Sequence, residues 1–279
     1  MEFLATLKCE DRSGIVNSLT TAILEIAGNI IENQQFTDPI TNTFVMRTRF
    51  ESNTSLSQAE KALAAGLARF QPELSVRDAH TPKRALLLVT KADHCLRDLL
   101  YLKDLGEMPV EFPLVVGNHA DLATLAASHG IKFHQLDTNR DRAAVETELA
   151  QIAVREGVDF IVLARYMQIL SPQFCEQFAN RIINIHHSFL PGFKGARPYH
   201  QAHAKGVKMI GATAHFVTKD LDEGPIIEQD IARVSHAATP EDLISMGRDI
   251  ERRVLSHAVK LFAEDRIFIV GNRTIVFSK

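Results

Sequence analysis

The sequence predicts an α/β protein of two domains, because two different orders of strands and helices follow one another along its 279 residues. The first 80 residues read as strand–helix–strand–strand–helix–strand, and the remainder alternates apolar strands with helices. Between them lies the polar segment Ala79-His-Thr-Pro-Lys83, which is typical of a linker. We therefore expect one domain at residues 1–80 and a second at residues 84–279.

The elements of the first domain follow from the spacing of its apolar residues. Residues 3–9 alternate as a strand does, and a helical repeat follows, with apolar residues at Ile15, Leu19, Ile23 and Ile26. The other expected elements are strands at 29–37, 42–50 and 73–79 and a helix at 56–70. This βαββαβ order is typical of a ferredoxin-like sheet with two helices on one face.

The second domain contains short apolar runs that are rich in β-branched residues. The expected strands are 85–89, 113–117, 132–136, 160–164 and 182–186, with helices at 119–128 and 140–155. Such strands, separated by helices, indicate a mostly parallel, Rossmann-like sheet that is buried on both faces. Strands at 210–217 and 226–234, a helix capped by Thr239 and a C-terminal hairpin complete the domain.

Composition disfavours several classes of partner. The formal net charge is −3 with both signs dispersed, which argues against nucleic acid. No apolar run approaches the roughly 20 residues that span a bilayer, and the N-terminus does not resemble a signal peptide. Cys9, Cys95 and Cys175 are odd in number and far apart, so we expect reduced thiols and a cytoplasmic protein.

Asn184 and His186 are the first candidates for chemistry. They are two residues apart at the end of an apolar strand, so their side chains are expected on the same side. In a parallel sheet the carboxyl ends of the strands border the ligand crevice. The spacing therefore indicates an amide and an imidazole that project together where ligands bind.

Two loops follow this strand. The first, residues 187–200, is long and rich in Gly and Pro, and such loops are often functional. It is expected to end in a short helix, with Pro198 near its start and Gly206 just past its end. Asp222 lies in the second, in a Gly-Pro turn from which its carboxylate can reach the same crevice. Turn formation is nevertheless the simpler explanation of an isolated Asp or strand-end Asn. Spacing alone thus leaves both a catalytic and a structural role open.

The segments NIHHSFLP, GATAHFV and DLDEGPII resemble the signature of the folate-dependent formyltransferases, which include glycinamide ribonucleotide formyltransferase. The resemblance covers residues 84–279 and implies the fold of a formyltransferase domain. On this pattern Asn184, His186 and Asp222 coincide with the catalytic Asn, His and Asp of the family.

The resemblance also implies a substrate pocket. The segment LARYMQIL resembles the one that lines the folate pterin pocket, and the family commonly has Arg where this chain has Gln168. The residues expected to bind the folate are Met167, Gln168, Leu170, Thr213 and His215.

The first domain resembles an ACT domain, a module that often binds amino acids, through the segments DRSGIV and GNI. A helix N-terminus can hold the carboxylate of such a ligand. The expected effector site consists of Asp11, Gly14, Ile15, Asn29 and Ile30. Pairing of ACT domains also implies a homo-oligomer, and a module used only for oligomerisation is the alternative.

An ACT-like domain before a formyltransferase-like domain resembles the organisation of the hydrolases of 10-formyltetrahydrofolate. This implies that 10-formyltetrahydrofolate and water give formate and tetrahydrofolate, which balances the one-carbon folate pool and supplies formate for purine biosynthesis. Asn184 and cationic His186 would stabilise the oxyanion, and Asp222 would charge His186 or accept a proton from water. We expect no metal and no cofactor, because hydrogen bonds can activate the formyl amide and the sequence shows no obvious set of three metal ligands at this site. His186 and His187 cannot easily chelate one ion, since adjacent strand residues point to opposite faces.

The turn after the first strand of the second domain helps to discriminate hydrolysis from transfer. Relatives that bind a ribonucleotide carry a Gly-rich phosphate loop there, whereas this chain has VTKADHC at residues 89–95. The missing glycines and the carboxylate of Asp93 argue against a phosphorylated amine as acceptor and favour water. The alternatives are a formyltransferase that uses another amine, a non-catalytic folate or amino-acid sensor, and a metal hydrolase.

Overall fold

The computed structural model describes residues 1–137, 139–188 and 198–278, and the chain folds into two compact units. Unit 1 contains residues 1–82, 265–271 and 275–279, and unit 2 contains residues 83–264 and 272–274. The division at residue 82 lies within the expected linker. The sequence predicts a second domain that includes all of residues 84–279, whereas in the structure most of the C-terminal hairpin belongs to unit 1.

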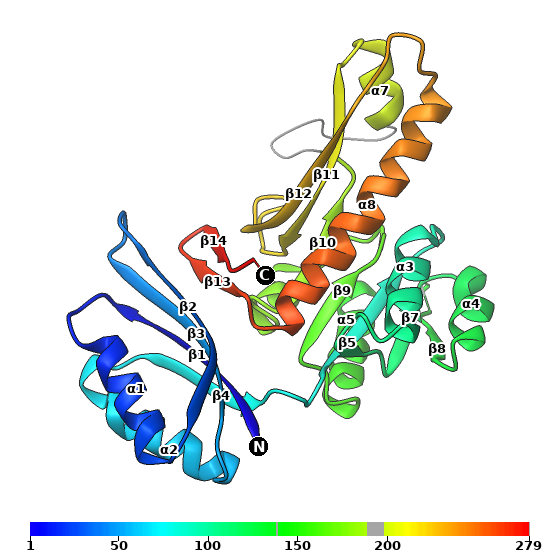
Figure 1. The fold of residues 1–279 in the computed structure, drawn as a ribbon. Helices are drawn as coiled ribbons and strands as arrows, with labels where there is room; N and C mark the ends of the chain where they lie inside the picture. Colours follow the sequence, from blue (N-terminus) through cyan, green and yellow to red (C-terminus); the bar gives the residue numbers. More distant parts are fainter. Residues whose placement is uncertain (138, 189–197, 279) are drawn as a thin grey trace. The chain divides into compact units, whose positions relative to one another are not determined.

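Unit 1 has the expected βαββαβ order, which Figure 1 shows in blue and cyan. Its elements are β1 (Glu2–Glu10), α1 (Ile15–Glu25), β2 (Asn29–Asp38), β3 (Thr43–Glu51), α2 (Leu56–Leu67), a short 3-10 helix (Ala68–Phe70) and β4 (Glu73–Asp78). The strands form an antiparallel sheet in the order β2-β3-β1-β4. Both helices lie on the same face of this sheet (Figure 1).

The two faces of this sheet are covered by different segments. Phe44 and Met46 face the core that α1 and α2 close, with Leu19 and Leu63 among its buried residues. Between them Val45 points to the other face, where it packs against the hairpin of β13 (Ile267–Val270) and β14 (Arg273–Val276). Successive side chains of β3 point to opposite faces of the sheet, so Val45 is available on the face away from the helices. Its contact with the hairpin explains why most of the hairpin belongs to unit 1.

Unit 2 is built on a second sheet in the order β12-β11-β10-β9-β5-β7-β8, with the short β6 beside β5. Its strands are β5 (Lys83–Val89), β6 (Val110–Glu111), β7 (Leu114–Gly117), β8 (Lys132–Gln135), β9 (Phe160–Leu163), β10 (Ile182–His186), β11 (Met209–Phe216) and β12 (Ile226–Arg233). The strands from β10 to β8 are parallel, while β11 and β12 are antiparallel to their neighbours. The sheet is thus mostly parallel, as predicted.

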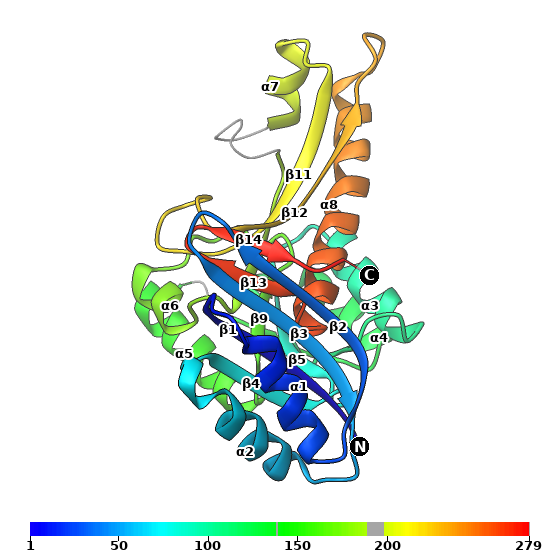
Figure 2. The same ribbon diagram turned by 60° about the vertical axis from the view of Figure 1, so that its left-hand side comes forward.

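Helices cover both faces of this sheet (Figures 1 and 2). They are α3 (His94–Asp104), a 3-10 turn (Ala120–Leu122), α4 (Ala123–Ser128), α5 (Arg142–Arg155), α6 (Pro172–Gln177), α7 (Pro198–Ala204) and α8 (Pro240–Ala263). On one face α5 and α6 pack on Leu86, Leu88 and Ile161. On the other face Phe262 of α8 contacts Phe160 and Phe216.

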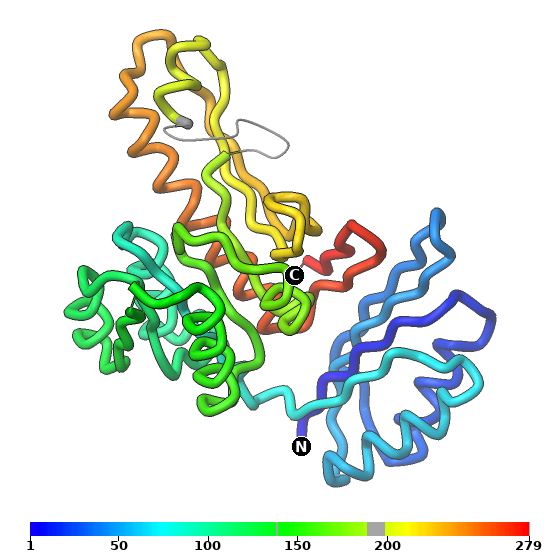
Figure 3. Tube along the Cα trace, turned by 180° about the vertical axis from the view of Figure 1, so that it is seen from behind, coloured from blue at the N-terminus to red at the C-terminus, as the bar shows by residue number. Residues whose placement is uncertain are grey.

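The longest helix, α8, starts as the sequence predicts. Thr239 caps it, Pro240 occupies its first turn, and Asp242 completes a capping box. α8 contacts β10, β11 and β12, and Figure 3 shows it running beside the two antiparallel strands. Within the described ranges, no helix is both long enough and apolar enough to cross a membrane.

In the part of the chain that the structure describes, three helices or strands were not expected: α3, α6 and β6. The two residues of β6 are too few for an apolar period to show, and α6 has fewer than two turns. By contrast α3 carries a full helical period, with Cys95, Leu96, Leu99 and Leu100 buried, so this helix was detectable.

Candidate active site

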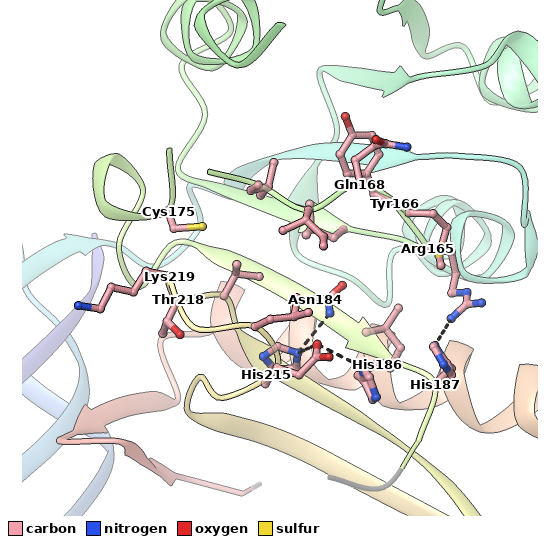
Figure 4. A pocket seen from close by; sticks show the side chains of 18 residues that line it. Arg165, Tyr166, Gln168, Cys175, Asn184, His186, His187, His215, Thr218 and Lys219 are labelled. Carbon is pink, nitrogen blue, oxygen red and sulfur yellow. Dashed lines mark hydrogen bonds and ion pairs between the residues drawn. The ribbon is translucent and has the colours of Figure 1, made fainter. Parts of the chain in front are cut away.

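A cavity of about 320 Å³ opens at the carboxyl ends of β9 and β10. Its lining comes from Leu163 at the end of β9 and residues 165–170 after it, from residues 184–187 at the end of β10, from His215 of β11 and the turn that follows, and from Cys175 of α6 (Figure 4). This position agrees with the expectation that ligands bind beyond the carboxyl ends of parallel strands.

The structure brings Asn184, His186 and Asp222 together in this cavity. Figure 4 labels Asn184 and His186, which lie at the end of β10. The amide of Asn184 donates a hydrogen bond from Nδ2 to Nε2 of His215, 3.2 Å away. His186 Nδ1 lies 3.2 Å from Oδ1 of Asp222. Antiparallel pairing of β10 with β11 sets Asn184 opposite His215, so the contact with His215 follows from strand register.

Asp222 reaches the cavity because the turn after β11 folds back on that strand. The backbone N–H of Phe216 donates to the carbonyl of Pro225 over 2.9 Å, which closes the turn. A Cβ atom on Gly224 would overlap the carbonyl oxygen of Phe216, so only glycine fits there. Asp222 itself has a φ of 58°, a left-handed conformation that Asp tolerates better than most residues.

Burial and hydrogen bonds determine the protonation states of Asp222 and His215. The hydrogen bond with His186 lowers the pKa of Asp222 despite its partial burial, so this group is a carboxylate at neutral pH. Burial lowers the pKa of His215, whose Nδ1 donates to the carbonyl of Phe216 over 2.9 Å. His215 is therefore neutral, with Nε2 as the acceptor that orients the Asn184 amide.

His187 departs from the expectation for adjacent strand residues. Its ring stacks on that of His186 with centroids 4.8 Å apart, and both rings border the cavity. The strand ends at His186, so the alternation of side chains does not extend to His187. Burial, with nearby Arg165 and His186, lowers the pKa of His187 to about 4.

Comparison with known proteins covers both units. Residues 83–259 match the Formyl transferase family. Formyltetrahydrofolate deformylase from Bacillus subtilis is 44% identical over 277 residues, which covers 98% of this chain and 92% of the relative. The crystal structure of formyltetrahydrofolate deformylase from Burkholderia mallei matches with a TM-score of 0.96 and 43% identity, over 99% of both chains. The chain belongs to the formyltetrahydrofolate deformylase family.

A second kind of relative matches less of this deformylase-family chain. The crystal structure of glycinamide ribonucleotide transformylase 1 from Symbiobacterium toebii has a TM-score of 0.68 and 34% identity. This match covers 96% of the transformylase but 72% of the present chain.

Four of the five residues expected to bind the folate line the cavity, and one does not. Met167, Gln168, Leu170 and His215 line the cavity. Thr213 lies outside its lining: it is fully buried, donates to the carbonyl of Ser188 and accepts a hydrogen bond from Gln229. Most of the predicted Gly- and Pro-rich loop, residues 189–197, lies outside the described residues.

Three of the five residues expected to bind an effector line one pocket, and two do not. Asp11, Gly14 and Ile15 line an open pocket of unit 1, together with Arg12 and Thr37. Asn29 and Ile30, at the other end of β2, do not line this pocket. Asn29 instead donates to Glu51, and Ile30 packs against the hydrophobic core.

One group of potential metal ligands occurs within the described ranges, and the sequence did not predict it. His94, Cys95 and Glu251 place one ligand atom each within 4.8 Å of one another. The carboxylate of Glu251 already contacts His94 over 2.7 Å and Tyr199 over 2.7 Å. The guanidinium of Arg165, 3.4 Å away, would repel a metal cation, so the group is better suited to an internal ion-pair network.

We expect Gly224→Ala to destabilise the protein by about 3 kcal/mol, because the added Cβ meets a backbone oxygen that cannot rotate away. Gly206→Ala is the matched control: its φ is 62°, but no atom lies within 4 Å of the added Cβ, so it should cost about 1–2 kcal/mol. Urea unfolding of the two variants measures the difference. Equal losses would contradict the close approach at Gly224.

Proposed function

We propose that this chain hydrolyses 10-formyltetrahydrofolate to formate and tetrahydrofolate. The observation that carries the proposal is the match of almost the whole chain, both units included, to proteins named formyltetrahydrofolate deformylase. The convergence of Asn184, His186 and Asp222 in one cavity supports it independently. In the cell this reaction would balance the one-carbon folate pool and supply formate for purine biosynthesis.

Asn184 and His186 are suited to stabilise the oxyanion that forms when water attacks the formyl carbon. The amide of Asn184 is oriented by His215, which occupies one of its two N–H groups and leaves the other for the substrate oxygen. His186, with Nδ1 towards Asp222, can present Nε2–H as a second donor. Preorganised donors of this kind are each worth about 10²–10³ in rate.

Asp222 is suited to two tasks that its position makes compatible. Its carboxylate lies 3.2 Å from Nδ1 of His186 and can accept a hydrogen bond from that nitrogen, which orients the ring. Its low pKa keeps it ionised at neutral pH, so it can also accept a hydrogen bond from the attacking water and relay the proton to N10 of the leaving folate.

The side chains in the turn between β5 and α3 favour water as the acceptor of the formyl group. A phosphate cradle needs backbone N–H groups that a ligand can approach, which glycines provide. Here Lys91, Ala92 and Asp93 form the turn, and the side chain of His94 at the start of α3 contacts the carboxylate of Glu251. A phosphorylated amine would meet two carboxylates there, whereas water needs no such anchor.

Hydrogen bonds from side chains suffice to activate a formyl amide, so we propose a reaction without metal or cofactor, with reduced folate as the substrate. Met167, Gln168 and Leu170 would contact the folate. A formyltransferase acting on a different amine is the remaining alternative, since Asn184, His186 and Asp222 serve transfer equally well.

Unit 1 is proposed to act as an ACT-like regulatory domain and to assemble the chain into a homo-oligomer. Its pocket offers the carboxylate of Asp11 for an ammonium group and the first turn of α1, after Gly14, for a carboxylate. These two features together fit a small amino acid.

Replacing the carboxylate of Asp222 should separate catalysis from binding. We expect Asp222→Asn to reduce kcat by about 10²–10⁴-fold, because it removes the charge beside His186 and the proton acceptor. Affinity for tetrahydrofolate should change little. Asp220→Asn, on an exposed residue of the same turn, is the control and should retain normal turnover. Near-normal turnover of Asp222→Asn would remove this residue from the mechanism.

The identity of the acceptor has a direct assay. In buffer alone, we expect one formate for each tetrahydrofolate formed from 10-formyltetrahydrofolate. Neither EDTA nor glycinamide ribonucleotide should change the rate, since the proposed mechanism uses neither a metal nor an amine. Faster formylation of an added amine would make the chain a transferase. Loss of activity in EDTA that zinc restores would establish a metal mechanism.

Regulation through unit 1 can be tested on the whole chain by calorimetry with the common amino acids, followed by kinetics. We expect one small amino acid to bind and to alter turnover, and Asp11→Asn to weaken its binding about 10-fold by removing a charged hydrogen-bond partner. Glu25→Gln, on the exposed end of α1, is the matched control. Absence of both binding and kinetic effect would favour a role in oligomerisation alone.

A further inference from the structure

A buried carboxylate lies behind the proposed catalytic residues. Glu251 of α8 is 1% exposed, and its oxygens contact three side chains from three different segments. Nε2 of His94 lies 2.7 Å from Oε2, the hydroxyl of Tyr199 donates to Oε1 over 2.7 Å, and Nε of Arg165 lies 3.4 Å from Oε2. Burial raises the pKa of Glu251, but the hydrogen bonds from His94 and Tyr199 and the charge of Arg165 together outweigh it, so this pKa is lowered and the group is a carboxylate.

The backbone of unit 2 accommodates this cluster at two unusual positions. Arg165 has a φ of 64°, an uncommon conformation for a long side chain. On α8, a Cβ atom on Gly247 would overlap the hydroxyl of Tyr199, so the glycine makes room for the tyrosine ring one turn before Glu251. The ion pair with Glu251 and the hydrogen bond to His187 hold Arg165 despite the strain.

Arg165 connects Glu251 to the histidine pair. Its Nη1 lies 3.1 Å from Nδ1 of His187 (Figure 4), and a guanidinium can only donate. Nδ1 of His187 is therefore the acceptor, and its ring proton is on Nε2. A cationic His187 would carry a proton on both nitrogens and would lose this hydrogen bond.

The stacked arrangement makes the charge of His187 important for His186. Two imidazole rings with centroids 4.8 Å apart repel each other when both are protonated. The charged or titratable groups that face His187, among the described residues, are Arg165, His186, Asp222 and Glu251. Asp222 lies against His186, whereas Arg165 lies against His187, so the two ends of the pair experience opposite charges.

We propose that Arg165 is a positioning residue, anchored by Glu251, that holds His187 as a neutral imidazole with its proton on Nε2, so that His186 alone carries the positive charge of the pair. The inference rests on the proposed hydrolysis, because a single cation beside Asn184 is what the oxyanion requires. It adds Arg165, His187 and Glu251 to the residues on which turnover depends.

The state of His187 can be measured without any assay of activity. In ¹⁵N NMR spectra of the whole chain, assigned with His187→Gln, we expect the His187 ring to remain neutral down to pH 5 with its proton on Nε2. Burial and Arg165 lower its pKa to about 4. Titration of this ring between pH 6 and 7, or a proton on Nδ1, would overturn the proposal even if the chain hydrolyses 10-formyltetrahydrofolate.

Variants of Arg165 test the consequence for turnover. In Arg165→Met we expect the pKa of His187 to rise from about 4 by about one unit. This should add a loss of kcat on the acid side, on the order of 10-fold at pH 4 relative to neutral pH, with little change in KM. Arg165→Lys keeps the charge and should restore most of the profile. Arg155→Met, which removes an exposed arginine of α5, is the control.

Two results would contradict the role of Arg165. An unchanged pH profile in a folded Arg165→Met protein would show that the cation of His186 does not depend on it, and equal losses at every pH, not restored by lysine, would indicate a structural role. Glu251→Gln provides a second test if Arg165→Met does not fold: it keeps Arg165 charged, so His187 should stay neutral in NMR spectra while its contact with the loosened arginine weakens. Absence of formate release from the unmodified chain would instead refute the proposed function.

Discussion

The contact between His186 and Asp222 depends on the register of two antiparallel strands and on one glycine. β10 must end at His186, β11 must pair with it so that Asn184 lies opposite His215, and the turn after β11 must return towards the sheet. Gly224 permits this return, because any side chain there would collide with the carbonyl of Phe216. A slip of one residue in β10 would turn Asn184 and His186 to the opposite face of the sheet, away from Asp222. The chemistry is thus a consequence of sheet geometry.

Burial then determines which groups carry charge. His215 is neutral because it is desolvated, and it accepts a hydrogen bond from Asn184. His187 is neutral for the same reason, reinforced by Arg165. Asp222 is ionised because His186 lies beside it. Three imidazoles at the end of two strands thereby acquire different tasks, although their ordinary pKa values are the same.

Much of the fold could be predicted from the sequence, because the relevant signals are local. The periods of residues 3–79 give the βαββαβ order, and the capping residues of α8 lie within four positions of its start. The sequence places the C-terminal hairpin in the second domain, whereas most of it belongs to unit 1 in the structure, and this difference arises because the packing contact is not local. Its packing partner, Val45, is more than 200 residues away, and no local pattern connects them.

In the candidate site, too, the residues with local sequence signals could be predicted, and those brought together only by tertiary contacts could not. Asn184 and His186 could be found because they share a strand and a side, and Asp222 needed the resemblance to a family. The cluster of His94, Arg165, Tyr199 and Glu251 could not be found, since it joins segments up to 157 residues apart. Thr213 was expected in the pocket, but as the residue opposite His186 in β11 it is buried in the sheet and hydrogen bonds to Ser188 and Gln229.

The same cluster bears on why a fold shared with a ribonucleotide transformylase can release formate to water. Both reactions need an oxyanion site, so the roles proposed for Asn184, His186 and Asp222 do not separate them. What separates them must lie where a second substrate would be held. At the first turn of α3 this chain supplies its own anion, Glu251, bonded to His94 and balanced by Arg165. A helix N-terminus whose side chains already contact an internal carboxylate offers less to a phosphate, because the second anion would be repelled by the first. The carboxylate that anchors Arg165 thus also weakens the place for an amine acceptor, so one buried charge can favour hydrolysis in two ways.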